Sequence, residues 1–108
     1  MEYKVLFSDA ARVDIKDIYE YIADVLLSQE AATNTTRGIL ASTRALSFMP
    51  KKNPVYRNEP WKSHDVRFTI FKSYMVFYKV DDTELAVTIL RIMYGGRDVS
   101  KQLNEDKL

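Results

Sequence analysis

Two arginines and a tyrosine in the last third of the chain have the types and spacing to bind a phosphate group. Arg67 alternates with apolar neighbours, and Arg91 and Tyr94 close a β-rich run shortly before Arg97. On neighbouring strands of an antiparallel sheet, Arg67 and Arg91 can lie on one open face with Tyr94 and Arg97 at its rim. Guanidinium groups hold phosphate oxygens through paired hydrogen bonds. These residues therefore predict a phosphate clamp.

A structural role for Arg91 is an alternative to phosphate binding. Its strand has apolar residues at both parities, which is typical of a central strand. A charge in such a place is costly unless it meets water or a partner. The expected partner is then an acid such as Asp98 or Asp65.

Other reaction chemistries find little support in the sequence. The chain has no cysteine, which excludes disulfides and thiolate chemistry and suits the cytoplasm, where we expect the protein. His64 is the single histidine and has no cysteine or carboxylate cluster beside it, so we predict no metal site and no cofactor. His64 is either a general acid or base or a loop residue without a role. Gly95-Gly96 lacks the lysine and serine of a phosphate-binding loop.

The middle of the chain is basic although the net charge is only +1. Residues 51–80 carry seven lysines or arginines and two acids, whereas residues 1–50 carry more acids than bases. This suits a phosphate-rich partner, but chance clustering on a solvated loop gives the same pattern. Tyr56, Trp61 and Phe71 can stack on bases, although aromatic residues beside strands more often pack in a core.

The first half of the chain predicts a strand and two helices. Tyr3, Val5 and Phe7 alternate with other residues as in a strand. Ser8 and Ser28 stand where helix N-caps belong, ahead of amphipathic stripes over residues 9–27 and 29–48. Pro50 ends the second helix. The short break between the helices predicts an antiparallel helix hairpin.

The second half predicts strands after a proline-rich loop over residues 50–64. Strands are expected at residues 66–70 and 74–80 and from residue 85 to the Gly95-Gly96 pair that ends the last strand, with a further short helix capped by Asp98. The order β-α-α-β-β-β gives a single α+β domain over residues 1–108. We expect the hairpin to cover one face of an antiparallel sheet, with function on the other face. No signal peptide or membrane-spanning run is recognised, so no membrane partner is expected.

The chain resembles the toxins of the RelE/ParE superfamily of bacterial type II toxin–antitoxin systems. The resemblance covers residues 3–103 and is carried by order and spacing. Its opening motif is Tyr3-x-Val5-x-Phe7-Ser8-x-x-Ala11-x-x-Asp14-Ile15-x-x-Ile18-x-x-Tyr21-Ile22, followed by Leu46-x-x-x-Pro50. The sheet motifs are Arg67, Tyr74-x-Val76-x-Tyr78-x-Val80 and Val87-x-Ile89-x-Arg91-Ile92-x-Tyr94-Gly95-x-Arg97-Asp98.

The resemblance implies a cognate antitoxin from the same operon and two possible targets. RelE-like members cleave mRNA on the ribosome, and ParE-like members block DNA gyrase. Our first expectation is a metal-independent, ribosome-dependent mRNA endoribonuclease with Arg67 and Arg91 as phosphate stabilisers and Tyr94 as acid or orienting group. Its RNA-binding residues would be Lys51, Lys52, Arg57, Lys62 and Arg97.

Two alternatives stay open at this point. One is a gyrase inhibitor without enzymatic activity, and the other is an inactive antitoxin-binding or plasmid-stabilisation module. Met93 stands where some ribonuclease members have histidine, and the closing motif also occurs in ParE-like chains.

Overall fold

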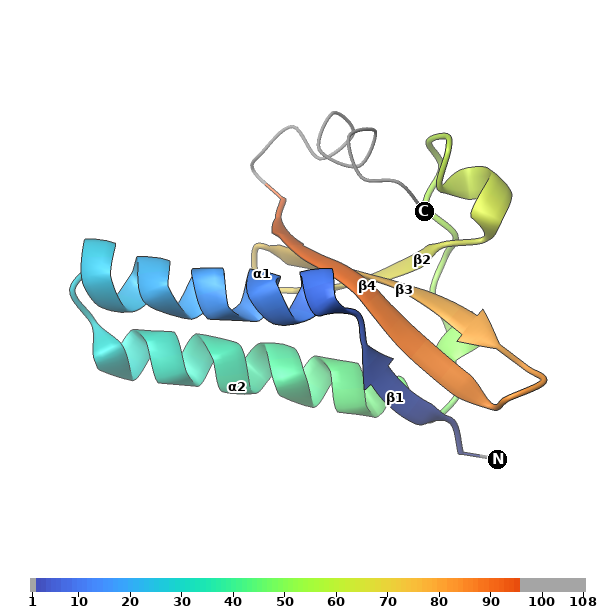
Figure 1. Cartoon of the computed structure of the whole chain (residues 1–108), viewed down its shortest axis with the longest axis horizontal. Coiled ribbons are helices and arrows are strands. Elements are labelled where there is room, and N and C mark those ends of the chain that lie inside the picture. The colour runs from blue at the N-terminus through green and yellow to red at the C-terminus, as the bar shows by residue number, and fades with distance from the viewer. Residues whose placement is uncertain (1, 96–108) are drawn as a thin grey trace.

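A helix hairpin packed against a four-stranded sheet makes up residues 2–95, the part of the chain that the computed structural model describes (Figure 1). The elements follow the predicted order β-α-α-β-β-β. They are β1 (Lys4–Phe7), α1 (Asp9–Glu20) with a π-helical turn (Tyr21–Val25), α2 (Gln29–Ala45), β2 (Arg67–Phe71), β3 (Tyr74–Asp81) and β4 (Ala86–Tyr94). None of these helices is long and apolar enough to cross a bilayer.

The sheet has the order β1-β4-β3-β2, which makes β4 a central strand, as its apolar residues predicted. β2, β3 and β4 form the expected antiparallel meander. β1 pairs with β4 in parallel, so the sheet is mixed where we expected an antiparallel one. Parallel neighbours need a long crossover connection, and here the hairpin and the first two meander strands lie between them.

Both helices begin at the predicted serine caps but end earlier than predicted. Ser8 Oγ accepts a hydrogen bond from the Ala11 amide at 3.0 Å, and Ser28 Oγ accepts one from the Ala31 amide at 3.1 Å. α1 widens into the π-helical turn, which ends before Leu27 takes a left-handed φ of 55°. α2 ends at Ala45, and Met49, the residue before Pro50, is also left-handed with a φ of 50°.

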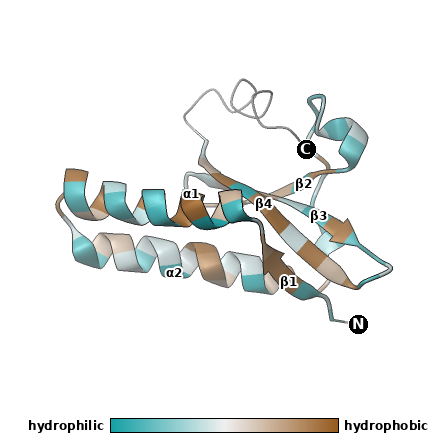
Figure 2. Cartoon of the chain, in the orientation of Figure 1, coloured by the Kyte–Doolittle hydropathy of each residue, from teal (hydrophilic) through white to brown (hydrophobic). Residues whose placement is uncertain are grey.

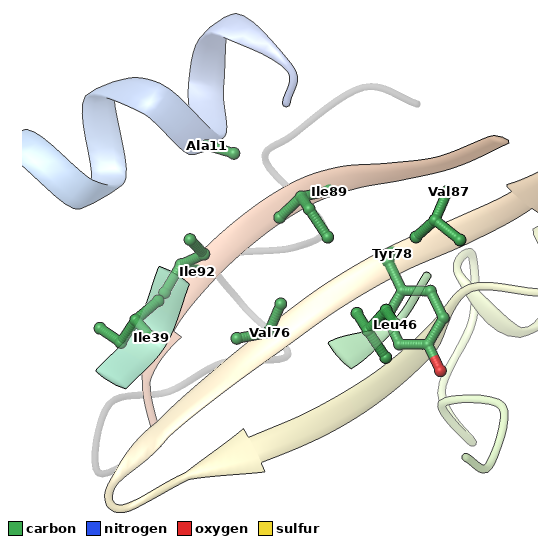
Figure 3. Close-up of a cluster of buried hydrophobic side chains, with 8 residues drawn as sticks. All are labelled: Ala11, Ile39, Leu46, Val76, Tyr78, Val87, Ile89 and Ile92. Atoms are coloured by element: carbon green, nitrogen blue, oxygen red, sulfur yellow. The ribbon is translucent and has the colours of Figure 1, made fainter. Parts of the chain in front are cut away.

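The main core lies between the helix hairpin and one face of the sheet. Figure 3 shows its fully packed members: Ala11, Ile39, Leu46, Val76, Tyr78, Val87, Ile89 and Ile92. Gly38 allows α2 to approach the sheet edge, because a Cβ there would lie 2.0 Å from Cζ of Phe71. The glycine that weakens the helix is therefore required by its packing.

A smaller core covers part of the opposite face of the sheet. Trp61 and Phe77 are buried there with Val66 and Met93, and Tyr56 meets the Phe77 ring edge-on at 5.2 Å. The chain between α2 and β2 folds over this face, where the Tyr56 amide donates to the Val66 carbonyl. Much of the face that we expected to be open is therefore filled by the loop's own aromatic side chains.

Candidate functional site

Arg91 forms an internal ion pair with Asp14 of α1. Its Nε donates to Asp14 Oδ2 at 2.7 Å, and one of its terminal nitrogens donates to Asp14 Oδ1 at 2.9 Å. The two side chains are only 16% and 11% exposed. Asp14 Oδ2 also accepts the Ile92 amide at 2.9 Å. The structural alternative for Arg91 is thus the observed arrangement, with Asp14 as a partner that was not expected, whereas the expected partner Asp98 lies outside the described residues.

The short first strand explains why a carboxylate is needed there. β1 pairs with β4 only as far as Phe7 and Ile89, so within residues 2–95 no strand lies beside the outer edge of β4 from Leu90 onward. Backbone groups at such an edge need other partners. Ser8 provides them first, since its amide donates to the Ile89 carbonyl and its Oγ donates to the Leu90 carbonyl at 2.8 Å. Asp14 continues this role at Ile92.

A bulge in β4 changes the direction of Arg91. In the pairing with β3, Tyr78 faces Ile89 and Phe77 faces Arg91, so Leu90 faces no residue. One extra residue breaks the alternation of side chains along a strand. Simple alternation would give Arg91 the same side of the sheet as Val87 and Ile89, but the extra residue breaks this pattern and the guanidinium reaches the strand edge beside α1.

Arg67 holds a different part of the molecule. It donates from Nη1 to the carbonyls of Lys51 at 3.1 Å and Asn53 at 2.6 Å. Its register partner Tyr78 donates to the Pro50 carbonyl at 2.6 Å, and burial raises the pKa of this hydroxyl. Together these side chains fix the chain after α2 against the sheet.

The structure does not place Arg67 and Arg91 in one clamp. β3 lies between their strands, which corresponds to two strand spacings or about 10 Å. Arg67 is directed to the backbone beyond α2, whereas Arg91 is directed to α1. The prediction that their guanidinium groups converge on an open face is wrong in this structure.

Tyr94 does lie near Arg91, in a groove between α1 and the end of β4. Tyr94 is 47% exposed, and its ring meets that of Tyr74 edge-on with centroids 5.8 Å apart. The groove has a volume of about 600 Å³ and is lined by Asp14, Asp17, Ile18, Tyr21, Leu26, Tyr74, Arg91, Ile92, Met93 and Tyr94. Two of the three proposed catalytic residues therefore share one groove, and Arg67 is not part of it.

The candidate RNA-binding residues are distributed over the chain between α2 and β2. Lys51 forms an ion pair with Asp82, whose carboxylate also accepts the Tyr3 hydroxyl at 2.8 Å. The hydrogen bond to Asp82 raises the pKa of Lys51 and lowers that of Asp82. Lys52, Arg57 and Lys62 have exposed positions, and a role in RNA binding remains a prediction for them. Arg97 and Asp98 lie outside the described residues.

The remaining candidates are resolved mainly as packing. Trp61 is buried against Phe77, and Phe71 lies over Gly38, so the core interpretation of both is confirmed. His64 is exposed at the end of a 3-10 turn (Lys62–His64). Over residues 2–95, no three His, Cys, Asp or Glu side chains are grouped to hold a metal ion.

Asp14 was not predicted as the partner of Arg91. It lies three residues after Ala11 and four before Ile18, so it shares the apolar face of α1 with them. An acid on a helix face that packs against a sheet needs a buried donor. The position of Asp14 on the apolar face of α1 could therefore have predicted that it has a buried hydrogen-bond donor as partner.

Comparison with known proteins matches this fold to bacterial toxins. The family model for the ParE toxin of the type II toxin–antitoxin system parDE matches residues 5–99. No curated protein matches the chain. The solved structure of a chromosomal ParDE system from P. aeruginosa aligns with a TM-score of 0.70 at 20% identity, over 86% of this chain and 96% of that one.

Two further solved structures carry the RelE name. The RelBE2 toxin–antitoxin complex of Mycobacterium tuberculosis aligns with a TM-score of 0.65 at 21% identity, over 87% of this chain and 92% of that one. A mutant of the E. coli toxin RelE in the free state aligns with a TM-score of 0.66 at 16% identity, over 97% of this chain and 94% of that one. At these identities the likeness shows the fold, whereas the family model spans most of the sequence. The chain belongs to the ParE toxin family and is a toxin of a type II toxin–antitoxin system.

Proposed function

We propose that this toxin acts by binding DNA gyrase and that it does not cleave RNA. The observation that carries the proposal is the internal ion pair between Arg91 and Asp14. The family model is that of parDE toxins, and ParE-like members of the superfamily that the sequence resembles block gyrase. A protein that acts by binding alone needs a complementary surface and no set of catalytic groups.

The chemistry of RNA cleavage gives the physical reason. An RNA 2′-hydroxyl attacks its neighbouring phosphate when the enzyme aligns both and neutralises the developing charge. Arg91 already shares its charge with Asp14. To bind a phosphate it would have to leave a mostly buried carboxylate unpaired, which costs several kcal/mol, about 3 to 5. Arg67 is too far away to replace it.

A ribosome-dependent endoribonuclease is the second candidate. The observation that favours it is the exposure of Lys52, Arg57 and Lys62 in the basic part of the chain. Tyr94 is also accessible in the groove that contains Arg91. These residues can bind an RNA backbone, although no phosphate clamp completes them within residues 2–95.

A cognate antitoxin is the proposed regulatory partner, and the cytoplasm is the proposed location. The P. aeruginosa and M. tuberculosis relatives are described as parts of toxin–antitoxin systems or complexes. We extend this pairing to the present chain, with the antitoxin encoded in the same operon.

Brief expression of the toxin in growing cells tests the proposal when both targets are followed together. We expect gyrase-dependent cleavage of plasmid DNA while mRNA remains intact. The triple variant Lys52→Ala/Arg57→Ala/Lys62→Ala should keep this activity, because it removes only the basic side chains that RNA would use. Codon-phased mRNA cuts that disappear on 2′-deoxy substrate, together with intact plasmid, would establish the nuclease and exclude the gyrase poison.

A further inference from the structure

The end of the helix hairpin exposes an apolar patch that nothing in residues 2–95 covers. We call this patch the hairpin tip and define it by Tyr21, Val25, Leu26 and Leu27. These side chains are between 52% and 84% exposed. Figure 2 shows the hydrophobic colour at the end of the hairpin that lies away from the sheet. Elsewhere in the described chain, exposed large hydrophobic residues stand singly or, for Phe48 and Met49, as a pair.

The backbone of the hairpin tip is unusual as well. Tyr21–Val25 form a π-helical turn, and such turns occur frequently at functional sites. Leu27 has a φ of 55°, which a branched side chain adopts at a cost of about 1 to 2 kcal/mol. Leu27 is also the most exposed of the four residues, so burial in this chain does not compensate for its conformation. The left-handed conformation ends the helix, with the Ser28 amide donating to the Ile22 carbonyl, and it leaves the Leu27 side chain exposed for a partner.

The negative charge around the hairpin tip favours a basic protein segment over a nucleic acid as its partner. Residues 17–36 contain the exposed acids Asp17, Glu20, Asp24 and Glu30 and no lysine or arginine, and only Glu20 has an ion-pair partner among the described residues, Lys16 at 3.9 Å. This surface repels nucleic-acid phosphates. It attracts a protein segment that carries lysines or arginines, since interfaces match potentials of opposite sign.

The hairpin tip is continuous with the groove described above. Tyr21 and Leu26 belong to the tip and also line the groove, where Ile18 and Tyr74 extend the apolar lining and Asp17 adds a carboxylate. A groove of about 600 Å³ has room for several side chains of a bound segment. Apolar patch, groove and acidic rim together form one surface.

We infer that the hairpin tip and its groove are the surface that docks on the target protein, and that the occupant is a basic amphipathic segment of that target. Its apolar side chains contact Val25, Leu26 and Leu27. Its lysines or arginines pair with Asp17 and Asp24. The inference rests on the proposed function, because it gives the contact by which a non-enzymatic toxin would hold gyrase.

Leu27→Asn provides the sharpest test, because it separates binding from folding. Asparagine tolerates the left-handed conformation better than leucine, so the unfolding midpoint should stay the same or rise. The affinity of the purified toxin for purified gyrase should fall by about tenfold or more, as for loss of an apolar anchor. Val13→Ser is the matched control, since Val13 is a similarly exposed apolar residue of α1 outside the tip. Its gyrase affinity should not change.

Charge reversal tests the acidic rim separately. Asp24→Lys should lower gyrase affinity by about tenfold at low salt, with a smaller loss at high salt. Glu84→Lys makes the same change in net charge at an exposed position between β3 and β4. It should leave the affinity unchanged.

The same titrations with the cognate antitoxin make the outcomes distinct. Unchanged gyrase affinity in both Leu27→Asn and Asp24→Lys overturns the inference while leaving the gyrase proposal intact. Lost antitoxin affinity with unchanged gyrase affinity also overturns it, because the surface then belongs to the antitoxin. Wild-type toxin that does not bind gyrase overturns the proposed function together with the inference.

Discussion

Arg67 and Arg91 are the same residue type on strands of one sheet, yet they stabilise different parts of the molecule. Arg91 binds a carboxylate on α1 and lies where β4 has lost its strand neighbour. Arg67 binds two backbone carbonyls and lies on β2, where the chain after α2 meets the sheet. One joins a strand to a helix, and the other joins a strand to a loop.

The difference shows that arginines on a sheet must be interpreted through the backbone groups near them. At Arg91, the end of β1 and the bulge at Leu90 leave backbone donors and acceptors that α1 has to satisfy. At Arg67, the carbonyls of Lys51 and Asn53 point toward the sheet. In both places groups within the chain bind the guanidinium, so its presence does not require a bound phosphate.

Asp14→Ala, on the Arg91 side of the comparison, should lower the free energy of unfolding more than any other variant considered below. It removes the carboxylate that binds the mostly buried guanidinium and the Ile92 amide, so the free energy of unfolding should fall by about 3 kcal/mol. Urea unfolding followed by circular dichroism measures the change. The double variant Asp14→Ala/Arg91→Ala should lose less than the sum of the single variants. A wild-type midpoint for Asp14→Ala would contradict a structural role for the pair.

Tyr78→Phe examines the Arg67 side of the comparison. It removes the hydrogen bond to the Pro50 carbonyl and should lower the free energy of unfolding by about 1.5 kcal/mol. Tyr21→Phe, at an exposed tyrosine, should have no effect on stability.

The same variant should alter the alkaline limit of stability. Burial raises the pKa of Tyr78 above its ordinary value of 10.0. The stability from its neutral hydroxyl is present below pH 10.0 and is lost as the pH rises through the folded pKa. Tyr78→Phe should therefore lose less stability than wild type above this pH. Parallel curves for the two proteins would contradict the assignment.

Arg67→Ala should have a smaller effect than Asp14→Ala because Arg67 is half-buried and its carbonyl partners can bind water. We expect a loss of about 1 kcal/mol, against almost none for Arg57→Ala. The variant should still arrest growth when it is expressed at a temperature where it is folded. Loss of growth arrest in a fully folded Arg67→Ala protein would restore the phosphate-binding interpretation.

Asp82→Asn should give the smallest effect, visible only in acid. The hydrogen bonds from Lys51 and then Tyr3 lower the pKa of Asp82 below 3.8. Their contribution is present above pH 3.8 and disappears as the pH falls through the folded pKa. The thermal midpoint of Asp82→Asn should therefore fall less than that of wild type in this range. An equal fall would show that the exposed ion pair adds nothing measurable.

Local sequence signals predicted the elements of the fold well. The serine caps and the helical spacing of apolar residues depend on contacts within a few positions, so Ser8 and Ser28 marked the helix starts correctly. The apolar residues at both parities of β4 identified it as central. The π-helical turn was missed because the apolar stripe continues through it without a break.

The site depends on long-range features that alternation cannot supply. Because of the bulge at Leu90, the residues after it point to the opposite sides of the sheet from those that alternation predicts. No local sequence pattern indicates this bulge. Asp14 and Arg91 are 77 positions apart, so their pairing follows only from the placement of α1 along the strand edge. The acid on the apolar face of α1 indicated a buried partner but not which one.

The four-residue first strand also sets an order for assembly of the chain. Within the described residues, Lys4–Phe7 pair with Ala86–Ile89, the Lys4 amide donates to the Leu85 carbonyl, and Ser8 binds Leu90, which lies 82 positions later. Contacts of such separation form late, because a long loop must close first. During synthesis the N-terminal segment therefore cannot form its contacts with β4 until almost all of the described chain has left the ribosome.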